Sequence, residues 1–354
     1  MQKRKISFPH FANYCIPVEH LITHGLEMEY ITPPPMTKRT MELGAKYSPD
    51  YACAPFKINL GCYIEALESG ADTLIQVGGT CRLGYYGELQ EQILRDLGYS
   101  FDFFNLAAAN YSKPQTFYSE FKKINPDLSL KKVTTGLLTM LKMVQYMDEI
   151  DDYIRQNVGF EVENGSFDRV YSDFLSALRL VETQKELKYL SENYMKKFKS
   201  VPVKKPKKPL RVGIVGEYYS VIDPFSSHFI ERELAKMGIV VERWMSVSNS
   251  LIHWPEKEIG EKIKGYAKYN MGATAMSTIE RALKFAKKGY DGIIHIKSFG
   301  CMPETDAMSI LQNISADYKI PILYFSFDTQ TADTGIHTRL EAFYDMITMR
   351  KEAN

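Results

Sequence analysis

The stretch Gly289-Tyr-Asp-Gly-Ile-Ile-His-Ile, followed after Lys297 by Ser298-Phe-Gly-Cys, decides the fold class of this chain. A short apolar run that begins after an Asp and ends in a glycine-containing loop is typical of a buried parallel strand. The first third of the chain repeats the pattern, because Gly70-Ala-Asp-Thr-Leu-Ile-Gln-Val leads through two glycines to Cys81. The repetition indicates two equivalent lobes that face each other across a shared cleft.

Strand-like runs alternate with helical segments in both outer sections of the chain. We expect strands at Lys5–Phe8, Met28–Ile31, Thr73–Val77, Ser100–Phe104, Leu210–Val215, Ile239–Trp244, Gly292–Lys297 and Pro321–Phe325. We expect helices at Pro17–His24, Pro55–Ser69, Glu88–Leu97, Ser227–Met237, Thr274–Lys288, Pro303–Ser315 and Thr338–Met346. This alternation predicts βαβ units, so the fold class is α/β with two doubly wound parallel sheets.

The patterning divides the chain into four parts. Residues 1–111 are predicted to form an N-terminal α/β domain, 112–199 a helical insertion or cap, and 210–354 a C-terminal α/β domain. Residues 200–209 are rich in proline and lysine and have no apolar period, which predicts a basic, exposed linker. We interpret this linker as a solvated hinge, and a docking patch for an acidic partner is the alternative.

The overall charge and composition exclude several classes of protein. The chain has 354 residues and a net charge of +1, so no general field attracts nucleic acid or a membrane surface. The apolar run at 6–9 is too short for a signal peptide, and no stretch reaches the length of a membrane-spanning helix. We therefore expect a soluble, cytoplasmic protein. In a reducing compartment each of its five cysteines is either a buried packing residue or a group that reacts or binds a ligand.

Cys81 and Cys301 follow strands of the two predicted sheets. In open α/β sheets, ligands bind outside the carboxyl ends of the strands, which is where both cysteines are placed. Gly79 and Gly300 precede them closely and allow the backbone to approach a bulky cofactor without a Cβ atom in the way. Both cysteines are therefore candidate ligands.

Cys53 and Cys301 share the pattern Cys-x-Pro in front of a predicted helix. Proline suits the first turn of a helix, so each cysteine should lie at a helix N-terminus, where partial positive charge favours a thiolate. Arg82, directly after Cys81, adds a further positive charge. The sequence therefore predicts an iron–sulfur cluster held by Cys53, Cys81 and Cys301.

Several alternatives stay open at the level of the residues. Cys15 also has a proline two residues later and is a candidate fourth ligand, whereas Cys62 is interpreted as a packing residue inside a helix. A structural zinc site usually has short CxxC pairs, which this chain lacks. A catalytic cysteine–histidine pair would use a histidine near a strand end, for which the candidates are His10, His228 and His295, but no local motif supports it.

Long motifs around these cysteines resemble a known family. They are Pro33-Pro-Pro-Met-Thr-Lys-Arg-Thr, Tyr47-Ser-Pro-Asp-Tyr-Ala-Cys-Ala-Pro-Phe-Lys, Gly78-Gly-Thr-Cys-Arg-Leu-Gly-Tyr-Tyr, Gly216-Glu-Tyr-Tyr-Ser-Val-Ile-Asp-Pro-Phe, Ser298-Phe-Gly-Cys-Met-Pro-Glu and Thr338-Arg-Leu-Glu-Ala-Phe. This series resembles the acyl-CoA dehydratase activase-related family. That family lies within the group of 2-hydroxyacyl-CoA dehydratase and benzoyl-CoA reductase subunits.

The resemblance implies two flavodoxin-like α/β domains with one [4Fe-4S] cluster between them. It places the three cysteine ligands at Cys53, Cys81 and Cys301 and leaves one iron open. A double-cubane cluster, as in some relatives, needs six thiolates, and this chain has five cysteines. The resemblance also implies an ATP-dependent activator as electron donor. No phosphate loop of the activator type is present here, so the chain is expected to accept the electron.

The leading functional hypothesis is a lyase or reductase of the 2-hydroxyacyl-CoA dehydratase type, or a subunit of one. It would use a low-potential electron for radical dehydration or reduction of an acyl-CoA. Four further residues are candidates for the cleft: Tyr85, Tyr86, Glu217 and Asp223. For each of them a purely structural role is an equally good interpretation. The rivals are a non-catalytic iron–sulfur scaffold and a reductase of other small molecules. A second copy of the chain is a further candidate partner.

Overall fold

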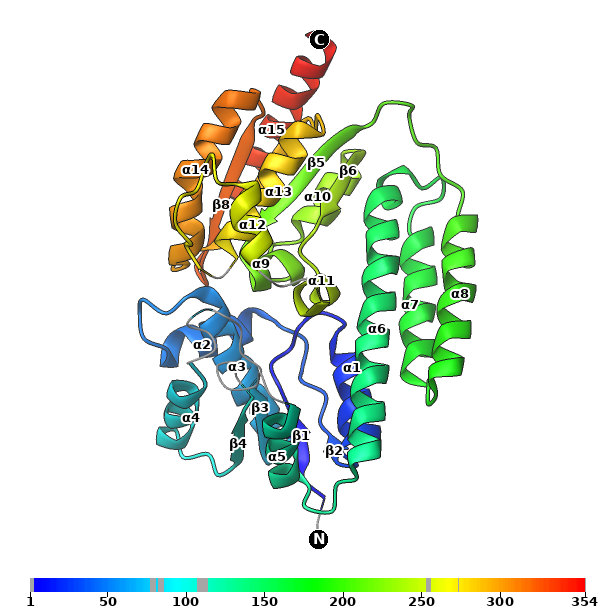
Figure 1. Ribbon diagram of the computed structural model, residues 1–354, viewed down its shortest axis with the longest axis vertical. Coiled ribbons are helices and arrows are strands. Elements are labelled where there is room, and N and C mark those ends of the chain that lie inside the picture. The colour runs from blue at the N-terminus through cyan, green and yellow to red at the C-terminus, as the bar shows by residue number, and fades with distance from the viewer. Residues whose placement is uncertain are drawn as a thin grey trace. The chain divides into compact units, whose positions relative to one another are not determined.

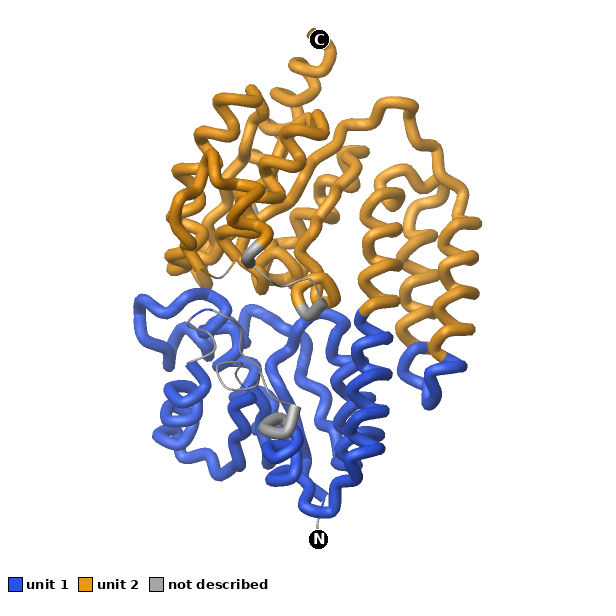
Figure 2. The backbone as a smooth tube through the Cα atoms, in the orientation of Figure 1, with its two compact units in different colours: residues 1–144, 178–186 blue, residues 145–177, 187–354 orange. Residues whose placement is uncertain are grey.

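The computed structural model describes residues 3–76, 81, 86–106, 114–252, 256–272 and 274–353 (Figure 1). The chain forms two compact units, which Figure 2 shows in different colours. Unit 1 consists of residues 1–144 and 178–186, and unit 2 consists of residues 145–177 and 187–354. Each unit contains one parallel sheet with helices around it.

The sheet of unit 1 has four parallel strands in the order β2-β1-β3-β4. Its strands are β1 (Lys5–Ser7), β2 (Glu29–Tyr30), β3 (Thr73–Gln76) and β4 (Asp102–Asn105). Its helices are α1 (Cys15–His20), the π-helix η1 (Leu21–Gly25), α2 (Lys38–Tyr47), α3 (Ala54–Glu68), α4 (Tyr86–Asp96) and α5 (Pro114–Ile124). The chain adds β2 on one side of β1 and then β3 and β4 on the other side. The order in which strands are added therefore reverses between β1 and β3, the two central strands.

Two apolar cores cover the opposite faces of this sheet. Leu74 and Ile75 are neighbours in β3, so their side chains point to opposite faces. Leu74 packs in a cluster with residues of α3 and α4. Ile75 packs in another cluster with residues of η1 and α5. Helices on both faces of a parallel sheet make unit 1 doubly wound.

The sheet of unit 2 has the equivalent strand order, β6-β5-β7-β8, and is also parallel throughout. Its strands are β5 (Leu210–Gly216), β6 (Ile239–Arg243), β7 (Gly292–Ser298) and β8 (Ile322–Phe327). Its helices are α9 (Tyr218–Ile222), α10 (Ile230–Lys236), α11 (Val247–Ile252), α12 (Glu256–Lys262), α13 (Ala275–Lys287), α14 (Met302–Tyr318) and α15 (Asp333–Ala353). Both units therefore have the flavodoxin-like order, and the prediction of an α/β fold is confirmed.

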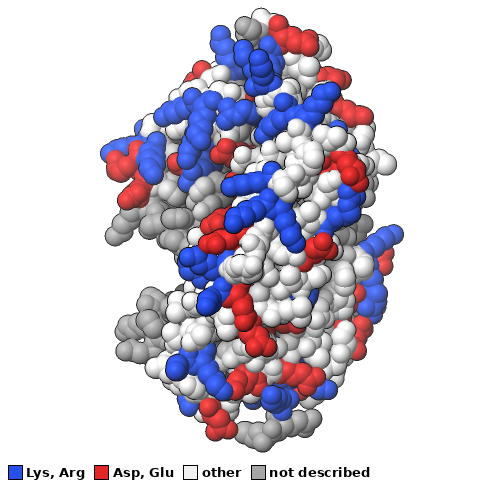
Figure 3. Space-filling view, turned by 90° about the vertical axis from the view of Figure 1, so that its right-hand side faces the viewer, with Lys and Arg blue, Asp and Glu red and all other residues white. Residues whose placement is uncertain are grey.

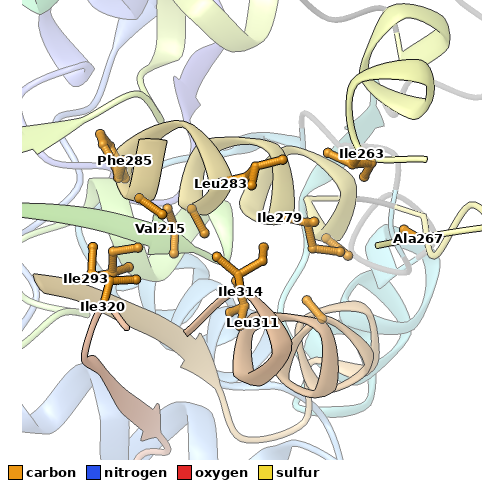
Figure 4. Close-up of a cluster of buried hydrophobic side chains, with 14 of the residues drawn as sticks. Val215, Ile263, Ala267, Ile279, Leu283, Phe285, Ile293, Leu311, Ile314 and Ile320 are labelled. Atoms are coloured by element: carbon orange, nitrogen blue, oxygen red, sulfur yellow. The ribbon is translucent and has the colours of Figure 1, made fainter. Parts of the chain in front are cut away.

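An apolar cluster of unit 2 lies between its sheet and helices α13 and α14. Figure 4 shows Val215 and Ile293 of the sheet pointing toward Leu283 of α13 and Leu311 of α14. On the other face, a Cβ atom at Gly292 would meet the Phe343 ring of α15. The two faces of this sheet are therefore also covered by helices.

The helical middle section contributes to both units. It contains α6 (Leu130–Asn157), the 3-10 helix η4 (Val158–Phe160), α7 (Ser166–Arg179) and α8 (Gln184–Ser200). The unit boundaries fall after residues 144, 177 and 186, inside α6, α7 and α8. Each of these helices therefore has residues in unit 1 and in unit 2.

The segment 201–209 after α8 is tied to the chain that follows α6. The amide of Lys204 donates a hydrogen bond to the Phe160 carbonyl at 2.7 Å, and that of Val162 donates to the Pro202 carbonyl at 3.0 Å. Residues 202–208 are exposed.

Figure 3 shows Lys and Arg side chains together with Asp and Glu side chains on one face of the molecule, so this face is not dominated by charge of one sign.

Some helix boundaries differ from those predicted by the sequence. Helix α2 was not predicted, and α10 begins at Ile230 rather than at Ser227. The later start has a backbone cause, because His228 and Phe229 have φ angles of 51° and 56° and cannot continue a right-handed helix. The predicted helix Pro17–His24 is instead α1 followed by η1. Of the predicted strand Thr73–Val77, Val77 lies outside the described residues.

Within the described ranges, no helix combines the length and the apolar character that crossing a membrane requires.

Helices α2 and α3 cross at two glycines. A Cβ atom on Gly44 would lie 1.8 Å from the Lys57 carbonyl oxygen, and one on Gly61 would lie 2.0 Å from the Thr40 carbonyl oxygen. Backbone atoms cannot move aside as a flexible side chain can. The close crossing places α3, the helix that follows Cys53, against α2 without intervening side chains.

We predict that Gly61→Ala destabilises the protein by about 1–3 kcal/mol, because the added methyl group forces the two helices apart. Chemical denaturation measures this change. The matched control is Gly260→Ala in α12, where no atom of the described residues outside its own turn of helix lies within 4 Å of the position that the added methyl group would take. That control should be stabilising by about 0.5–1 kcal/mol, since alanine favours a helix over glycine. Equal stabilities for the two variants would contradict the tight crossing.

Candidate functional site

Cys301 lies between the carboxyl end of β7 and the start of α14. It is the N-cap residue of α14, with φ −80° and ψ 100°, and Pro303 stands in the first turn. Its amide donates to the Ser298 carbonyl at 3.0 Å, and its carbonyl accepts from the Thr305 amide at 3.1 Å. The side chain is half-buried. The helix N-terminus therefore offers partial positive charge beside the Cys301 sulfur.

Lys297 is a second positive charge near Cys301, and it is not among the site residues predicted from the sequence. It is 5% exposed at the end of β7. Its Nζ donates to the carbonyl oxygens of Phe299 at 3.1 Å and Ser298 at 3.4 Å. Burial lowers the pKa of Lys297, and the negative charges of Cys301 and Glu304 act in the opposite direction. The one signal in the sequence is a lysine that interrupts an apolar strand.

Cys53, in unit 1, also lies at the start of a helix, although α3 precedes β3 whereas α14 follows β7. It is the N-cap residue of α3, with φ −65° and ψ 157°, and Pro55 stands in the first turn. Its carbonyl accepts a hydrogen bond from the Lys57 amide at 3.3 Å. The side chain is half-buried. Cys53 and Cys301 therefore have the local geometry that the Cys-x-Pro pattern predicts.

Cys81 is half-buried and belongs to unit 1. It follows β3, which pairs with both β1 and β4. Arg82 and Gly79, which were predicted to approach the cofactor, lie outside the described residues. Gly300 is described, and it lies exposed between Phe299 and Cys301. The predictions for Arg82 and Gly79 stay predictions.

The three predicted ligands belong to different units. Cys53 and Cys81 are in unit 1, and Cys301 is in unit 2. Among the residues that the structure describes, no three His, Cys, Asp or Glu side chains form a group that could hold a metal ion. A common site for these three cysteines therefore stays a prediction.

The three cysteines nevertheless fit the chemistry of an iron–sulfur cluster. Thiolates are the ligands that such clusters use, and solvent exposure of the cluster is one of the factors that set its reduction potential. The three candidates are half-buried, whereas Cys62 is only 1% exposed inside α3. The burial pattern therefore separates the candidate ligands from the packing residue.

Cys15, the candidate fourth ligand, is buried in α1 of unit 1. Its sulfur lies 4.0 Å from Nη2 of Arg179, which also forms an ion pair with Glu19. Burial raises the pKa of the Cys15 thiol, and the Arg179 charge opposes this effect in part. Burial thus favours the neutral thiol, the form that does not ligate a metal.

The other cleft candidates have local structural roles. Glu217 caps α9, where its carboxylate accepts hydrogen bonds from the amides of Tyr219 and Ser220, both at 2.8 Å. Asp223 is 1% exposed and accepts a hydrogen bond from the Ser226 amide at 2.8 Å.

Of the two candidate tyrosines, Tyr86 is described and Tyr85 lies outside the described residues. The Tyr86 ring packs edge-on against Phe56 of α3 at a centroid distance of 4.7 Å. This contact joins the start of α4 to the first turn of α3, the turn that follows Cys53. Tyr86 therefore supports that turn.

Burial raises the pKa of Glu217 above its ordinary value, and the nearby charge of Glu304 acts in the same direction. A raised carboxyl pKa means that the folded protein holds this proton more tightly than the unfolded chain does. Its contribution to stability is therefore fully present below the ordinary pKa and is lost as the pH rises through the folded-state pKa.

Wild type should lose stability as the pH rises above the ordinary carboxyl pKa of about 4. We predict that Glu217→Gln makes this loss smaller, because the amide does not titrate. Urea denaturation at several pH values measures the slope. Glu258→Gln, which changes an exposed side chain of α12, is the matched control and should keep the wild-type slope. A Glu217→Gln slope equal to that of wild type would show that burial of this carboxyl has no such effect.

The strand order and the cysteine at the carboxyl edge of β7 define a flavodoxin-like α/β protein with a candidate ligand site. The chain belongs to the family described as 2-hydroxyglutaryl-CoA dehydratase, D-component, whose model matches residues 124–347, more than half of the chain. The resemblance found in the sequence is thus confirmed at the level of this family. No curated protein matches the chain.

The family match covers part of the motifs that carried the resemblance. The motifs at 216–225, 298–304 and 338–343 lie inside the matched residues, together with Cys301. Cys53 and Cys81 precede residue 124 and lie outside them. Cys301 is therefore the candidate ligand on which the family match and the local geometry coincide.

Proposed function

We propose that this chain is a cluster-binding subunit of the 2-hydroxyacyl-CoA dehydratase type, with one [4Fe-4S] cluster held by Cys53, Cys81 and Cys301. The observation that carries the proposal is the position of Cys301. It is a half-buried N-cap cysteine at the carboxyl edge of a flavodoxin-like sheet, in a chain of this dehydratase family. Cys53 supports the proposal because it has the same local geometry in unit 1.

The residues around Cys301 have roles that suit such a cluster. When bound, a cubane with one open iron supplies a low-potential electron and a coordination position for a substrate oxygen. Lys297 places positive charge beside the Cys301 loop and holds the Phe299 carbonyl. Positive charge and donated hydrogen bonds offset the negative charge that thiolates bring.

Two exposed apolar side chains lie next to Cys301 in the sequence. Phe299 is 70% exposed and Met302 is 60% exposed, and both lie within two residues of Cys301. Exposed apolar side chains at a candidate site favour contact with a ligand or a protein partner. The acyl part of an acyl-CoA is a ligand of this kind, and an ATP-dependent activator is the partner that would deliver the electron.

We predict that the anaerobically purified chain contains about four iron atoms and as much acid-labile sulfide, the content of one cubane. Cys301→Ala, Cys53→Ala and Cys81→Ala should each lose most of the iron, because each removes one of only three ligands. Cys62→Ala is the control, since Cys62 is buried in α3, and it should keep the wild-type iron content.

Electron paramagnetic resonance of the reduced protein distinguishes an enzyme from a scaffold. A spectrum that changes when an acyl-CoA is added supports the dehydratase-type function. A cluster that does not respond to acyl-CoA favours the scaffold. Full iron content in Cys301→Ala would refute the ligand assignment.

A further inference from the structure

A fully buried carboxylate lies in the first turn of α14, three residues after Cys301. Glu304 and His295 of β7 are both 0% exposed, and Nε2 of His295 lies 2.8 Å from Oε2 of Glu304. The other carboxylate oxygen, Oε1, accepts hydrogen bonds from the Thr274 hydroxyl at 2.5 Å and the Thr278 hydroxyl at 3.1 Å. Strand β7 and helices α13 and α14 therefore meet at one carboxyl group.

The hydrogen bonds of Glu304 restrict the position of α14. A buried carboxylate is costly to desolvate, and an apolar side chain of similar volume often fills such a place at a lower cost. Unlike an apolar side chain, the carboxylate restricts the geometry of its surroundings, because each of its hydrogen bonds tolerates only a small range of distances and angles. The first turn of α14 is thus held against β7 and α13 by directional contacts.

The same turn carries Cys301. The Cys301 carbonyl accepts hydrogen bonds from the amide of Thr305 at 3.1 Å and from its hydroxyl at 2.9 Å. On the other side, the Cys301 amide donates to Ser298, and Lys297 holds the Phe299 carbonyl. Cys301 is therefore fixed between the end of β7 and a helical turn whose own position depends on Glu304.

We propose that Glu304 is a positioning residue for Cys301, acting through its hydrogen bonds to His295, Thr274 and Thr278. The inference rests on the proposed function in that Cys301 is taken as a cluster ligand. Side chains that orient metal ligands without touching the metal commonly change metal affinity by about 10–100-fold when they are replaced. Glu304 does this through the backbone of the first turn of α14.

The first measurement follows the Cys301 sulfur without any metal. In the iron-free full-length chain, iodoacetamide alkylation at fixed pH is quantified by mass spectrometry for Cys301, with Cys53 as the internal reference. Glu304→Ala should make Cys301 react about tenfold faster, because the turn that holds it is released, and should leave Cys53 unchanged. Glu304→Gln keeps an oxygen for the threonine hydroxyls and should restore much of the wild-type rate.

The second measurement uses the iron-loaded chain. Glu304→Ala should lose iron to a chelator about tenfold faster than wild type and should shift its electron paramagnetic resonance spectrum. The matched control is Glu65→Ala in α3. Glu65 is 6% exposed and accepts hydrogen bonds from Thr40 at 2.6 Å and Arg39 at 3.1 Å, so its loss also empties a buried polar site. Because Glu65 lies in the helix that follows Cys53, the Cys301 alkylation of this variant is read as an absolute rate, which should equal that of wild type.

The outcomes separate this inference from the proposed function. A folded Glu304→Ala whose Cys301 alkylation lies within about twofold of wild type would overturn the positioning role. If Glu304→Ala does not fold, Thr274→Val is used instead, because it removes one hydrogen bond to Glu304. It should make Cys301 alkylation faster, by less than is expected for Glu304→Ala, and an unchanged rate would overturn the positioning role. A wild-type chain that binds no iron would count against the proposed function alone, because the alkylation rates test Glu304 without metal.

Discussion

The close approach of β5 and β7 is the constraint on which the rest of unit 2 depends. Gly216 ends β5 with a φ of 143°, and a Cβ atom there would lie 1.8 Å from the Ile296 carbonyl oxygen. The Glu217 amide donates to that same carbonyl at 2.8 Å. These contacts join the two central strands at their carboxyl ends. The connections that leave this edge lead to the capped start of α9 and to the loop that carries Cys301.

The polar groups at this edge divide into two kinds. Lys297 and the N-terminus of α14 bring positive charge to the Cys301 loop. Glu304, in the first turn of α14, has no exposure to solvent. Glu217 is occupied as a helix cap. Positive charge near Cys301 thus comes from Lys297 and the N-terminus of α14, whereas the carboxylates of Glu217 and Glu304 accept hydrogen bonds that fix the start of α9 and the first turn of α14.

In unit 1, the helix that follows Cys53 is held in place by different contacts. This cysteine-capped helix, α3, is held against α2 by the crossing at Gly44 and Gly61 rather than by a buried carboxylate in its first turn. The Glu65 side chain, near the end of α3, accepts its hydrogen bonds from Thr40 and Arg39 at the start of α2. The two N-cap cysteines, which precede helices at different places in the two units, are therefore fixed by different contacts.

The sequence by itself determined the elements whose cause is local. Apolar runs bounded by glycine and Asp marked the strands, and proline two residues after Cys53 and Cys301 placed both at helix starts, because these preferences act within one turn of chain. Tertiary structure alone decided the rest. Helix α2, the roles of Lys297 and Glu304, and the helix boundary at Phe229 depend on contacts between residues far apart in sequence or on a backbone conformation that no pattern encodes.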